Sequence, residues 1–382
     1  MKNNLKKSLC IILALATLTS VLFAGSVFAY ADGDATSGWC GDKAKYSYDS
    51  ATETLKIEGK GTLYSYAFGD YDNKNNVKNI IIGEGITGIN SECFPNFDGI
   101  TEIKLPNSLR FIDDVAFIDC DNLKAVTIPD SVNYIGFNVF SRTAITVDDS
   151  NWQDHMLYVD NCLIQLDSEY LKYEQSCEIK VKDGTRLIAG NAFCNSNKIT
   201  AVTFPDSLKH IGNSVFYNTS IKTITIPAGI ESIDYSAFNY TQKLKTVNYL
   251  GTKAEAEKIA ITGDCGAIKN KHFKNLFDKK VKIKYIKPTA PKSLSVKSAK
   301  KALSIKWKKQ TGVTGYQLQY ARNNKFTKNK KNVNIKNAKT VSKTVKKLKS
   351  KKAYYVRIRS YKTFNGKKYY SDWSKAKKIK TK

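Results

Sequence analysis

The chain has 382 residues, and its 62 lysines and arginines against 34 aspartates and glutamates give a formal net charge of +28. One apolar run lies near the N-terminus and no second one follows, so we expect no integral membrane span in the rest of the chain. There is no Cys-x-x-Cys pair and no Gly-rich phosphate loop, which disfavours zinc-binding and nucleotide-binding classes.

Residues 1–31 have the pattern of a secretory signal. Its charged start is formed by Lys2, Lys6 and Lys7. The apolar run that follows, 10–23, is too short for a committed membrane span. Small residues two positions apart end at Ala29 and again at Ala31, so we expect cleavage after one of the two. The pattern predicts a secreted, extracellular protein with no integral span once the signal is removed.

One phrase returns six times through the middle of the chain. Its clearest copies read ITEIKLPNSLRFIDDVAF at 100–117, LKAVTIPDSVNYIGFNVF at 123–140, ITAVTFPDSLKHIGNSVF at 199–216 and IKTITIPAGIESIDYSAF at 221–238. The copies close on Phe94, Phe117, Phe140, Phe193, Phe216 and Phe238. The steps between these residues are 23, 23, 53, 23 and 22, so the third step is one period plus an insertion of about 30. A fixed period of this length predicts a solenoid of stacked coils.

Each copy contains a short strand followed by a turn. Val126, Thr127 and Ile128 alternate in and out, which is typical of a strand with one buried face, and the proline after them ends the pairing. We therefore expect a mainly β fold. The outward strand positions include Thr127, Thr203, Thr223, Thr225 and Asn248. Two interpretations stay open: a docking face for an extended protein or glycan, or a polar surface of residues that simply suit strands.

The repeat phrase resembles the BspA-like, or treponemal, class of leucine-rich repeat found in bacterial surface antigens. That class has a proline after the strand and ends in Ala-Phe or Val-Phe. Four copies here keep the proline. The copies ending at Phe94 and Phe193 have Gly83 and Lys182 in its place, so we expect these two coils to be distorted.

The resemblance extends beyond the repeats. Residues 37–63, SGWCGDKAKYSYDSATETLKIEGKGTL, are similar to the β-hairpin cap of this family, and 244–261, LKTVNYLGTKAEAEKIAI, to its closing coil. It implies an N-terminal β cap over 32–76, a leucine-rich repeat solenoid over 77–265, and a closing segment with a proline linker over 266–291.

An irregular insertion at about 141–178 breaks the period. It carries the aromatic residues Trp152, Tyr158, Tyr170 and Tyr173. Insertions in solenoids often lie on the binding face, where aromatic rings stack on sugars or anchor a partner. Inserted segments also use aromatic residues to cover a break in the core, and the sequence leaves both interpretations open.

The tail of the chain has the pattern of a second domain. Short alternating runs occur at 294–296, 303–307, 316–320 and 354–359, which is typical of a β-sandwich. The tail resembles a fibronectin type III domain: Trp307 matches the core tryptophan of that family's second strand, and Leu348 precedes Tyr354 by the tyrosine-corner spacing. The segment YYSDWS at 369–374 is similar to the last strand of bacterial versions. The resemblance implies a basic fibronectin type III-like sandwich over 292–382.

The net charge is confined to the tail. From 288 to 382 there are 30 basic residues and one acid, Asp372, or +29, whereas 1–287 hold 32 basic and 33 acidic residues, or −1. Such a domain attracts polyanions, among them cell-wall polymers, host glycosaminoglycans and membrane head groups, although lysine also coats surfaces for solubility. No nucleic-acid motif accompanies the charge, so nucleic acid is disfavoured. Candidate polyanion-binding residues are Lys346, Lys347, Lys349, Lys351, Lys352, Arg357 and Arg359.

The sequence offers no catalytic grouping. Seven cysteines follow the signal, an odd number, and one bridge between Cys162 and Cys177 would fit in the insertion. His210 occupies a variable slot of the repeat, so we expect it on the surface. No Ser-His-Asp or Cys-His arrangement can be built, and we expect neither catalytic residues nor a metal or other cofactor.

These features predict a secreted, non-enzymatic protein of the cell surface. The BspA resemblance implies adhesion, with the solenoid binding an extracellular protein or glycan on host or neighbouring cells. The basic domain is then either a spacer or an electrostatic tether to anionic cell-wall polymers. The alternatives are a glycan-binding accessory module of a secreted degradative system, and an enzyme with an unrecognised site in the insertion.

Overall fold

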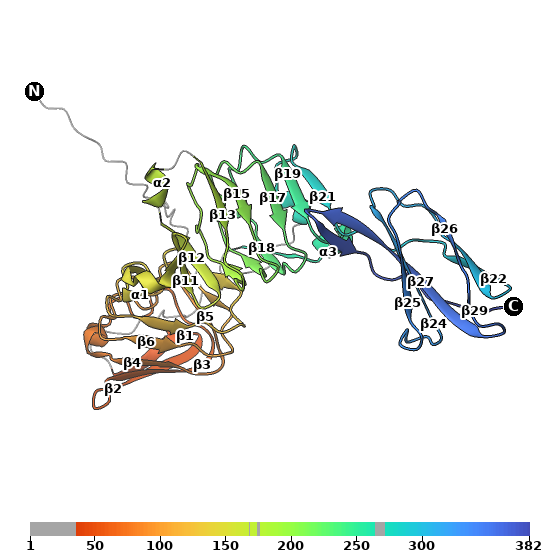
Figure 1. The fold of residues 1–382 in the computed structure, drawn as a ribbon. Coiled ribbons are helices and arrows are strands. Elements are labelled where there is room, and N and C mark those ends of the chain that lie inside the picture. Colours follow the sequence, from red (N-terminus) through yellow and green to blue (C-terminus); the bar gives the residue numbers. More distant parts are fainter. Residues whose placement is uncertain (1–35, 168, 174–175, 264–271) are drawn as a thin grey trace, which may run out of the picture.

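The computed structural model describes residues 36–382 except 168, 174–175 and 264–271. The predicted signal at 1–31 and Cys265 therefore lie outside the described residues. The chain forms a solenoid of stacked coils followed by a β-sandwich (Figure 1), so the mainly β fold class is confirmed. No helix in the described part of the chain is both long and apolar enough to cross a membrane.

The N-terminal cap starts both faces of the solenoid. Its strands are β1 (Ser37–Gly41), β2 (Lys43–Asp49) and β3 (Thr54–Thr62), which pair in antiparallel order. The first half of β3 pairs in parallel with β4 (Asn79–Ile82), and its last residues pair with β5 (Ile86–Ile89). Because β3 pairs with the first strand of both sheets, the coils after it can add strands to it on the front and on the back.

The coils that follow repeat this pattern in register. Each has a front strand, a turn, a back strand and a loop that ends on the repeating phenylalanine. The elements are η1 (Asp72–Asn76), β6 (Glu102–Lys104), β7 (Phe111–Ile112), β8 (Ala125–Thr127) and β9 (Tyr134–Ile135). β4, β6 and β8 line up on the front, and β5, β7 and β9 on the back.

The phenylalanines form a continuous stack inside the coils. The ring centroids of Phe68 and Phe94 lie 5.2 Å apart, those of Phe94 and Phe117 5.5 Å, and those of Phe117 and Phe140 6.0 Å. The Phe94 and Phe117 rings are within 3° of parallel, so the coil ending at Phe94 is regular, contrary to expectation. Gly83 replaces proline there without distortion because its N–H donates to Ile57 O, an extra rung of the ladder.

A left-handed turn holds each phenylalanine inward. The residue two positions after it has positive φ in all six coils, as at Asn96 (60°), Asp119 (60°) and Asn218 (55°). Asparagine and aspartate tolerate this conformation better than most residues, since their short polar side chains bond locally. Val115, two positions before Phe117, also has φ 50°, which is strained for a β-branched residue.

The insertion forms a hairpin wedged between two halves of the solenoid. Its elements are α1 (Ala144–Val147), η2 (Asp149–Asn151), β10 (Trp152–Gln153), β11 (Met156–Val159), β12 (Cys162–Leu166) and α2 (Tyr170–Tyr173). β12 pairs in parallel with β14 (Leu187–Ile188) and so takes the place of a back strand. On the front, none of the described residues forms a strand that pairs with the free edge of β8, so the front sheet of the first half ends there.

Alternate residues of the hairpin pack on different cores. Leu157 and Val159 join the core of the first half, whereas Met156 and Tyr158 join that of the second. The hairpin also closes the strand edges beside it: Asp160 Oδ2 accepts from Ile128 N at 2.7 Å, and Tyr158 Oη accepts from Lys182 N at 3.1 Å. The β11–β12 hairpin is therefore part of the solenoid's interior.

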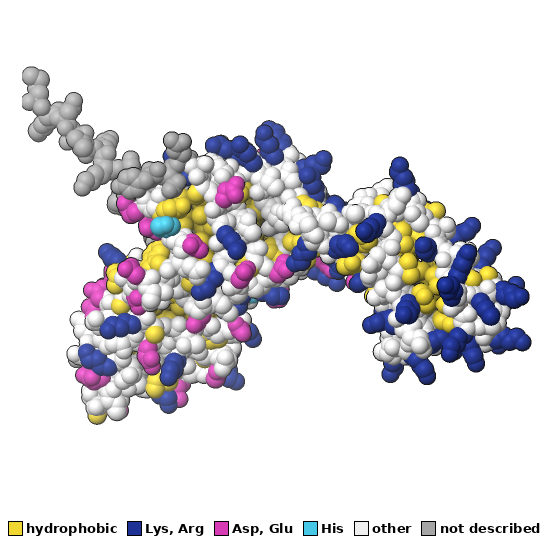
Figure 2. Space-filling view, viewed as in Figure 1, with side chains coloured by type: hydrophobic (Ala, Val, Ile, Leu, Met, Phe, Trp, Pro, Cys, Tyr) yellow, Lys and Arg dark blue, Asp and Glu magenta, His cyan; other side chains and the backbone are white. Residues whose placement is uncertain are grey.

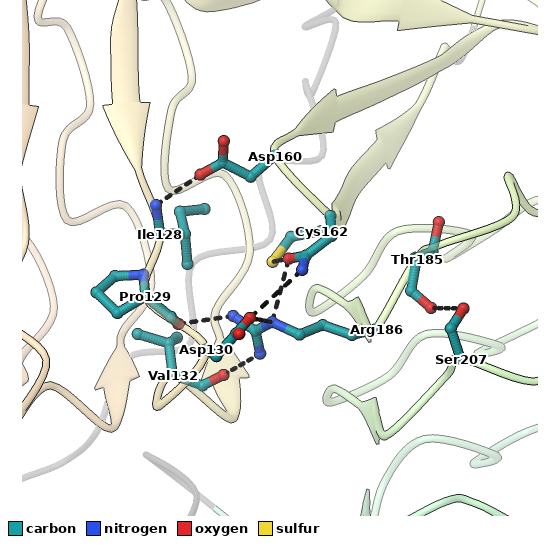
Figure 3. A network of polar contacts seen from close by, with 10 residues as sticks. Ile128, Pro129, Asp130, Val132, Asp160, Cys162, Thr185, Arg186 and Ser207 are labelled. Atoms are coloured by element: carbon teal, nitrogen blue, oxygen red, sulfur yellow. Dashed lines mark hydrogen bonds and ion pairs between the residues drawn. The ribbon is translucent and has the colours of Figure 1, made fainter.

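Arg186 joins the two halves at the corner after the front strands (Figure 3). Its Nη2 donates to Pro129 O at 2.8 Å and its Nη1 donates to Val132 O, both in the first half. Its Nε donates to Asn161 Oδ1 at 3.1 Å in the hairpin and lies 3.2 Å from Asp130 Oδ1. Arg186 is only 8% exposed and gives both carbonyl oxygens a charged donor, although Pro129 O also accepts from Val132 N at 3.0 Å.

The second half continues the same two sheets in separate pieces. Its elements are β13 (Cys177–Lys180), β15 (Ile199–Thr203), β16 (His210–Ile211), β17 (Thr223–Ile226), β18 (Ser232–Asp234), β19 (Thr246–Tyr249), α3 (Lys253–Ala256), β20 (Ala260–Thr262), η4 (Phe273–Leu276) and β21 (Lys282–Tyr285). The back strands β12, β14, β16, β18 and β20 pair without a break. Cys162 is a buried free thiol, so the suggested bridge to Cys177 is not formed.

The sandwich has its own core, which shares no residue with the solenoid cores. Its strands are β22 (Ser295–Ala299), β23 (Ala302–Lys306), β24 (Gly315–Ala321), β25 (Lys331–Ile335), β26 (Ser342–Val345), β27 (Ala353–Phe364), β28 (Lys367–Tyr370) and β29 (Lys377–Lys380). Trp307 is buried in this core, as predicted. The tyrosine corner is also formed, since Tyr354 Oη accepts from Lys349 N at 3.0 Å.

Replacing Arg186 with Met should weaken the joint between the halves. The substitution keeps most of the apolar side chain but leaves the Pro129 and Val132 carbonyls without their charged donor, a loss of about 3 kcal/mol in the free energy of unfolding. Urea denaturation measures it. The matched control is Arg142→Met, because Arg142 pairs with Asp119 on the surface, and it should cost less than about 1 kcal/mol. Equal losses in the two variants would contradict the assigned role of Arg186.

His210 lies half-buried on β16 and not on the surface as expected, with Nδ1 2.8 Å from Ser232 Oγ. Burial lowers the pKa of its imidazole from 6.5 to about 4, against the opposing charge of Glu231. In the unfolded chain His210 then binds a proton below about pH 6.5, whereas in the folded protein it does so only below about pH 4. Stability should therefore fall as the pH drops through this window.

The matching variant is His210→Gln, which removes this titration. Between pH 7 and pH 4 the wild type should lose up to about 3 kcal/mol more unfolding free energy than the variant. Urea midpoints at the two pH values provide the measurement. Identical pH profiles for both proteins would show that His210 is not responsible.

Candidate functional site

The front sheet of the solenoid presents the predicted threonines in separate groups. Thr127 on β8 and Thr203 on β15 are exposed, as is Thr223 on β17, while Thr225 is half-buried. They belong to three different sheets, which end at β8, β15 and β17. Asn248 was expected to face outward but is 6% exposed, because Thr225 on one side and the β21 strand on the other cover it. Among the described residues, no ladder of backbone hydrogen bonds therefore connects all four threonines, although β15 and β17 belong to neighbouring coils.

A groove lies on the front of the first half instead. It has a volume of about 370 Å³ and is lined by residues of β3, β4 and β6, among them Thr54, Asn79, Ile81, Glu102, Lys104 and Pro106. Ile81 is 51% exposed at its floor, an apolar side chain on a solvated sheet face. The signal for it was present in the run Ile80-Ile81-Ile82, where an isoleucine occupies the outward position of the strand.

The aromatic residues of the insertion mostly make contacts within the protein. Tyr158 is 6% exposed in the core of the second half, and burial raises the pKa of its phenol. Trp152 is half-buried, with Nε1 donating to Thr146 O at 3.0 Å. Tyr170 stacks on His155 with ring centroids 3.9 Å apart. The side chain of Tyr173 lies outside the described part of the structure.

The candidate basic residues of the sandwich fall into two groups. Lys346, Lys347, Lys349, Lys351 and Lys352 are exposed around the loop between β26 and β27. Arg357 and Arg359 lie half-buried on β27. Burial lowers the pKa of both guanidinium groups, and for Arg357 the neighbouring charge of Arg359 adds to the effect. Figure 2 shows lysines and arginines over the visible face of the sandwich, whereas both signs of charge mix over the solenoid.

Arg357 and Arg359 are held in an aromatic stack that the sequence analysis missed. The guanidinium carbon of Arg357 lies 3.9 Å from the centroid of Phe326 and 4.6 Å from Trp373, and that of Arg359 lies 4.4 Å from Trp373 and 3.9 Å from Tyr370. The i, i+2 spacing of the two arginines predicts a shared strand face. Nothing in the sequence indicates that Phe326 and Trp373 meet there.

The one acid of the basic domain lies at its junction with the solenoid. Asp372 Oδ1 is 3.8 Å from Lys287 Nζ, which is itself 2.6 Å from Glu255 Oε1 of α3. Lys367 at the start of β28 pairs with Asp206 of the solenoid. The junction thus pairs charges of opposite sign from the two domains.

The described residues contain no group of three or more side chains suited to hold a metal ion. Burial raises the pKa of the Cys40, Cys120 and Cys162 thiols to about 12, so they stay protonated at neutral pH and are poor nucleophiles.

Comparison with known families identifies both parts of the chain. The family "BspA type Leucine rich repeat region" matches in six copies over residues 45–161 and 165–287, more than half of the chain. The fibronectin type III domain matches residues 289–377. No curated protein matches the chain.

Several solved structures are similar in part. A leucine-rich repeat protein from Eubacterium ventriosum ATCC 27560 is 17% identical, covering 56% of this chain and 72% of its own, with a TM-score of 0.28. A myokine structure is 20% identical over 25% of this chain and 97% of its own, with a TM-score of 0.21. The FN1–FN3 domains of chicken CNTN1 are 24% identical over 26% of this chain and 32% of their own, with a TM-score of 0.22.

Both families are typically non-enzymatic interaction domains, and BspA-type proteins are often secreted or found at the surface. The repeat match spans the cap, the coils and the closing strands described above. The chain therefore belongs to the BspA-type leucine-rich repeat family and carries a fibronectin type III domain after its repeats.

Proposed function

We propose that this protein is secreted and held at the cell surface by its basic fibronectin type III domain, while the repeat solenoid binds an extracellular protein ligand. The domain binds anionic cell-wall polymers by charge. The solenoid presents its front sheet, including the groove around Ile81, to host or neighbouring cells. No step of this role requires catalysis.

The separation of charge carries the proposal. Thirty basic residues and one acid lie between 288 and 382, and the rest of the chain is close to neutral. That single acid, Asp372, lies 3.8 Å from Lys287 Nζ of the solenoid. A field of one sign then extends over the remaining surface and raises the local concentration of polyanions.

The solenoid is suited to act independently of the tether. Its two cores and the core of the sandwich share no side chains, so each part buries its own apolar surface. A stacked β-coil array exposes an extended sheet whose outward positions vary without disturbing the core. The exposed Ile81 and the charged pair Glu102 and Lys104 give the groove both apolar and polar contacts.

The test compares the mature full chain with a chain ending at residue 287. Full-length protein should sediment with purified bacterial cell-wall fragments at about 0.1 M salt and be released at about 1 M, because the Debye length shrinks from about 10 Å to about 3 Å. The shorter chain should stay in solution at both. Retention that ignores salt, or equal retention of the shorter chain, would contradict the tether.

The same shorter chain separates the role of the solenoid. It should bind immobilised host extracellular-matrix protein saturably and at physiological salt. If only the full-length protein binds, and the isolated solenoid captures neither matrix protein nor cells, the ligand-binding role belongs to the basic domain and not to the repeats.

A further inference from the structure

Four cations lie along the outer face of β27. Arg357 and Arg359 lie two residues apart on this strand, about 6.6–6.8 Å along it. At one end Lys378 of β29 lies 5.9 Å above the ring of Tyr355, and at the other Lys368 of β28 lies 5.1 Å from that of Tyr361. These four cations, Lys378, Arg357, Arg359 and Lys368, are called the β27 stripe.

The two arginines of the stripe are fixed before any ligand arrives. Arg357 Nε donates to Gln319 Oε1 at 2.8 Å, and Arg359 donates to Gln317 Oε1 through Nε at 2.9 Å and Nη2 at 2.7 Å. The glutamines are held in turn, each donating at 2.8 Å to an asparagine of β25. With Trp373 between the guanidinium groups and a further ring on the other side of each, their planes cannot turn freely.

Hydrogen-bonding capacity remains at the edges of both groups. A guanidinium has five N–H donors, of which Arg357 uses one and Arg359 two in these bonds. Throughout the described residues no carboxylate pairs with either arginine. Both are half-buried, which strengthens any charge-assisted bond they form compared with one in open water.

A basic hollow adjoins the stack. It has a volume of about 450 Å³, and Trp373 lines it together with Lys292, Lys375 and Lys377. Trp373 therefore belongs both to the wall of this hollow and to the stack with Arg357 and Arg359. A chain lying along β27 can continue into this hollow without leaving positive potential.

We propose that the β27 stripe is a binding site for a linear polymer bearing phosphate or sulfate groups, with Arg357 and Arg359 each binding one group. The inference rests on the proposed tether and names its ligand chemistry and its contact face. The edge of a guanidinium matches two oxygens of a tetrahedral oxyanion, and a neighbouring lysine adds positive charge beside it. The lysines around the β26–β27 loop, by contrast, are exposed, and they attract anions without the planar two-donor edge of a guanidinium.

The test keeps the net charge constant. In the full-length protein, Arg357→Lys with Arg359→Lys preserves both positive charges but removes the bidentate edges, the aromatic stack and the glutamine bonds. Calorimetric titration with short inorganic polyphosphate chains at about 0.15 M salt should show affinity lowered about tenfold or more. The control, Lys346→Gln with Lys347→Gln, removes two charges and should lower affinity only about two- to threefold.

The result that overturns the site is clear-cut. If the two Arg→Lys substitutions leave polyphosphate affinity unchanged, or if the loop variant loses more, binding follows the charge count and the β27 stripe is not a site. Thermal unfolding of each variant shows whether the sandwich is intact. If the arginine variant unfolds, tryptophan fluorescence provides a second test. Polyphosphate should change the emission of the wild type but not that of Trp373→Phe. An unchanged emission of the wild type would refute the site.

Parallel titrations with a sulfated glycan and with polyphosphate distinguish the two sources of the same chemistry. The outcome is also separable from that of the proposed function. If cell walls retain the protein but the arginine variant binds polyphosphate as well as the wild type does, the site is refuted and the tether is not. Tight, arginine-dependent polyphosphate binding by a protein that cell walls do not retain refutes the tether and leaves the site standing.

Discussion

A β-coil cannot stand alone, because one face of its strands and both of its edges need a neighbour. This protein meets that requirement at its cap and again at its middle. β3 pairs with the first strand of each sheet, and the β11–β12 hairpin sits where the repeat breaks. The hairpin packs one set of side chains on each half, and its Asp160 and Tyr158 side chains accept hydrogen bonds from the strand edges beside it. Arg186 adds a buried charged link across the same junction.

This packing separates the residues that stabilise the solenoid from the surfaces that remain available to partners. The aromatic side chain most central to the insertion, Tyr158, is interior, so the front groove around Ile81 and the outer sandwich are the better candidates for contact with partners. Charge is separated in the same way, with opposite signs meeting at the junction through Lys287 and Asp372. Under the proposed function, the nearly neutral solenoid and the strongly basic domain bind different molecules.

Much of the architecture could be predicted from local pattern. A repeating phenylalanine and a proline after each strand define a coil, and Trp307 with the Leu348–Tyr354 spacing defines the sandwich core. What failed depended on contacts between distant residues. His210 occupies a variable slot, yet its neighbours Ser232 and Glu231 come from the next coil and enclose it. Phe68 begins the aromatic stack without the repeat phrase around it. The Phe326–Arg357–Trp373 contact joins a loop, a strand and a tail segment, and no spacing in the sequence indicates it.

The account depends most on the hairpin being a structural wedge between the halves, and amide hydrogen exchange of the intact protein tests this directly. Residues 156–166 should be protected as strongly as the strands β8 and β14 and should open together with them as urea is added. Rapid exchange across 156–166 while both flanking strands stay protected would mean that the insertion is a surface loop, and the two halves would then have to be joined by other contacts.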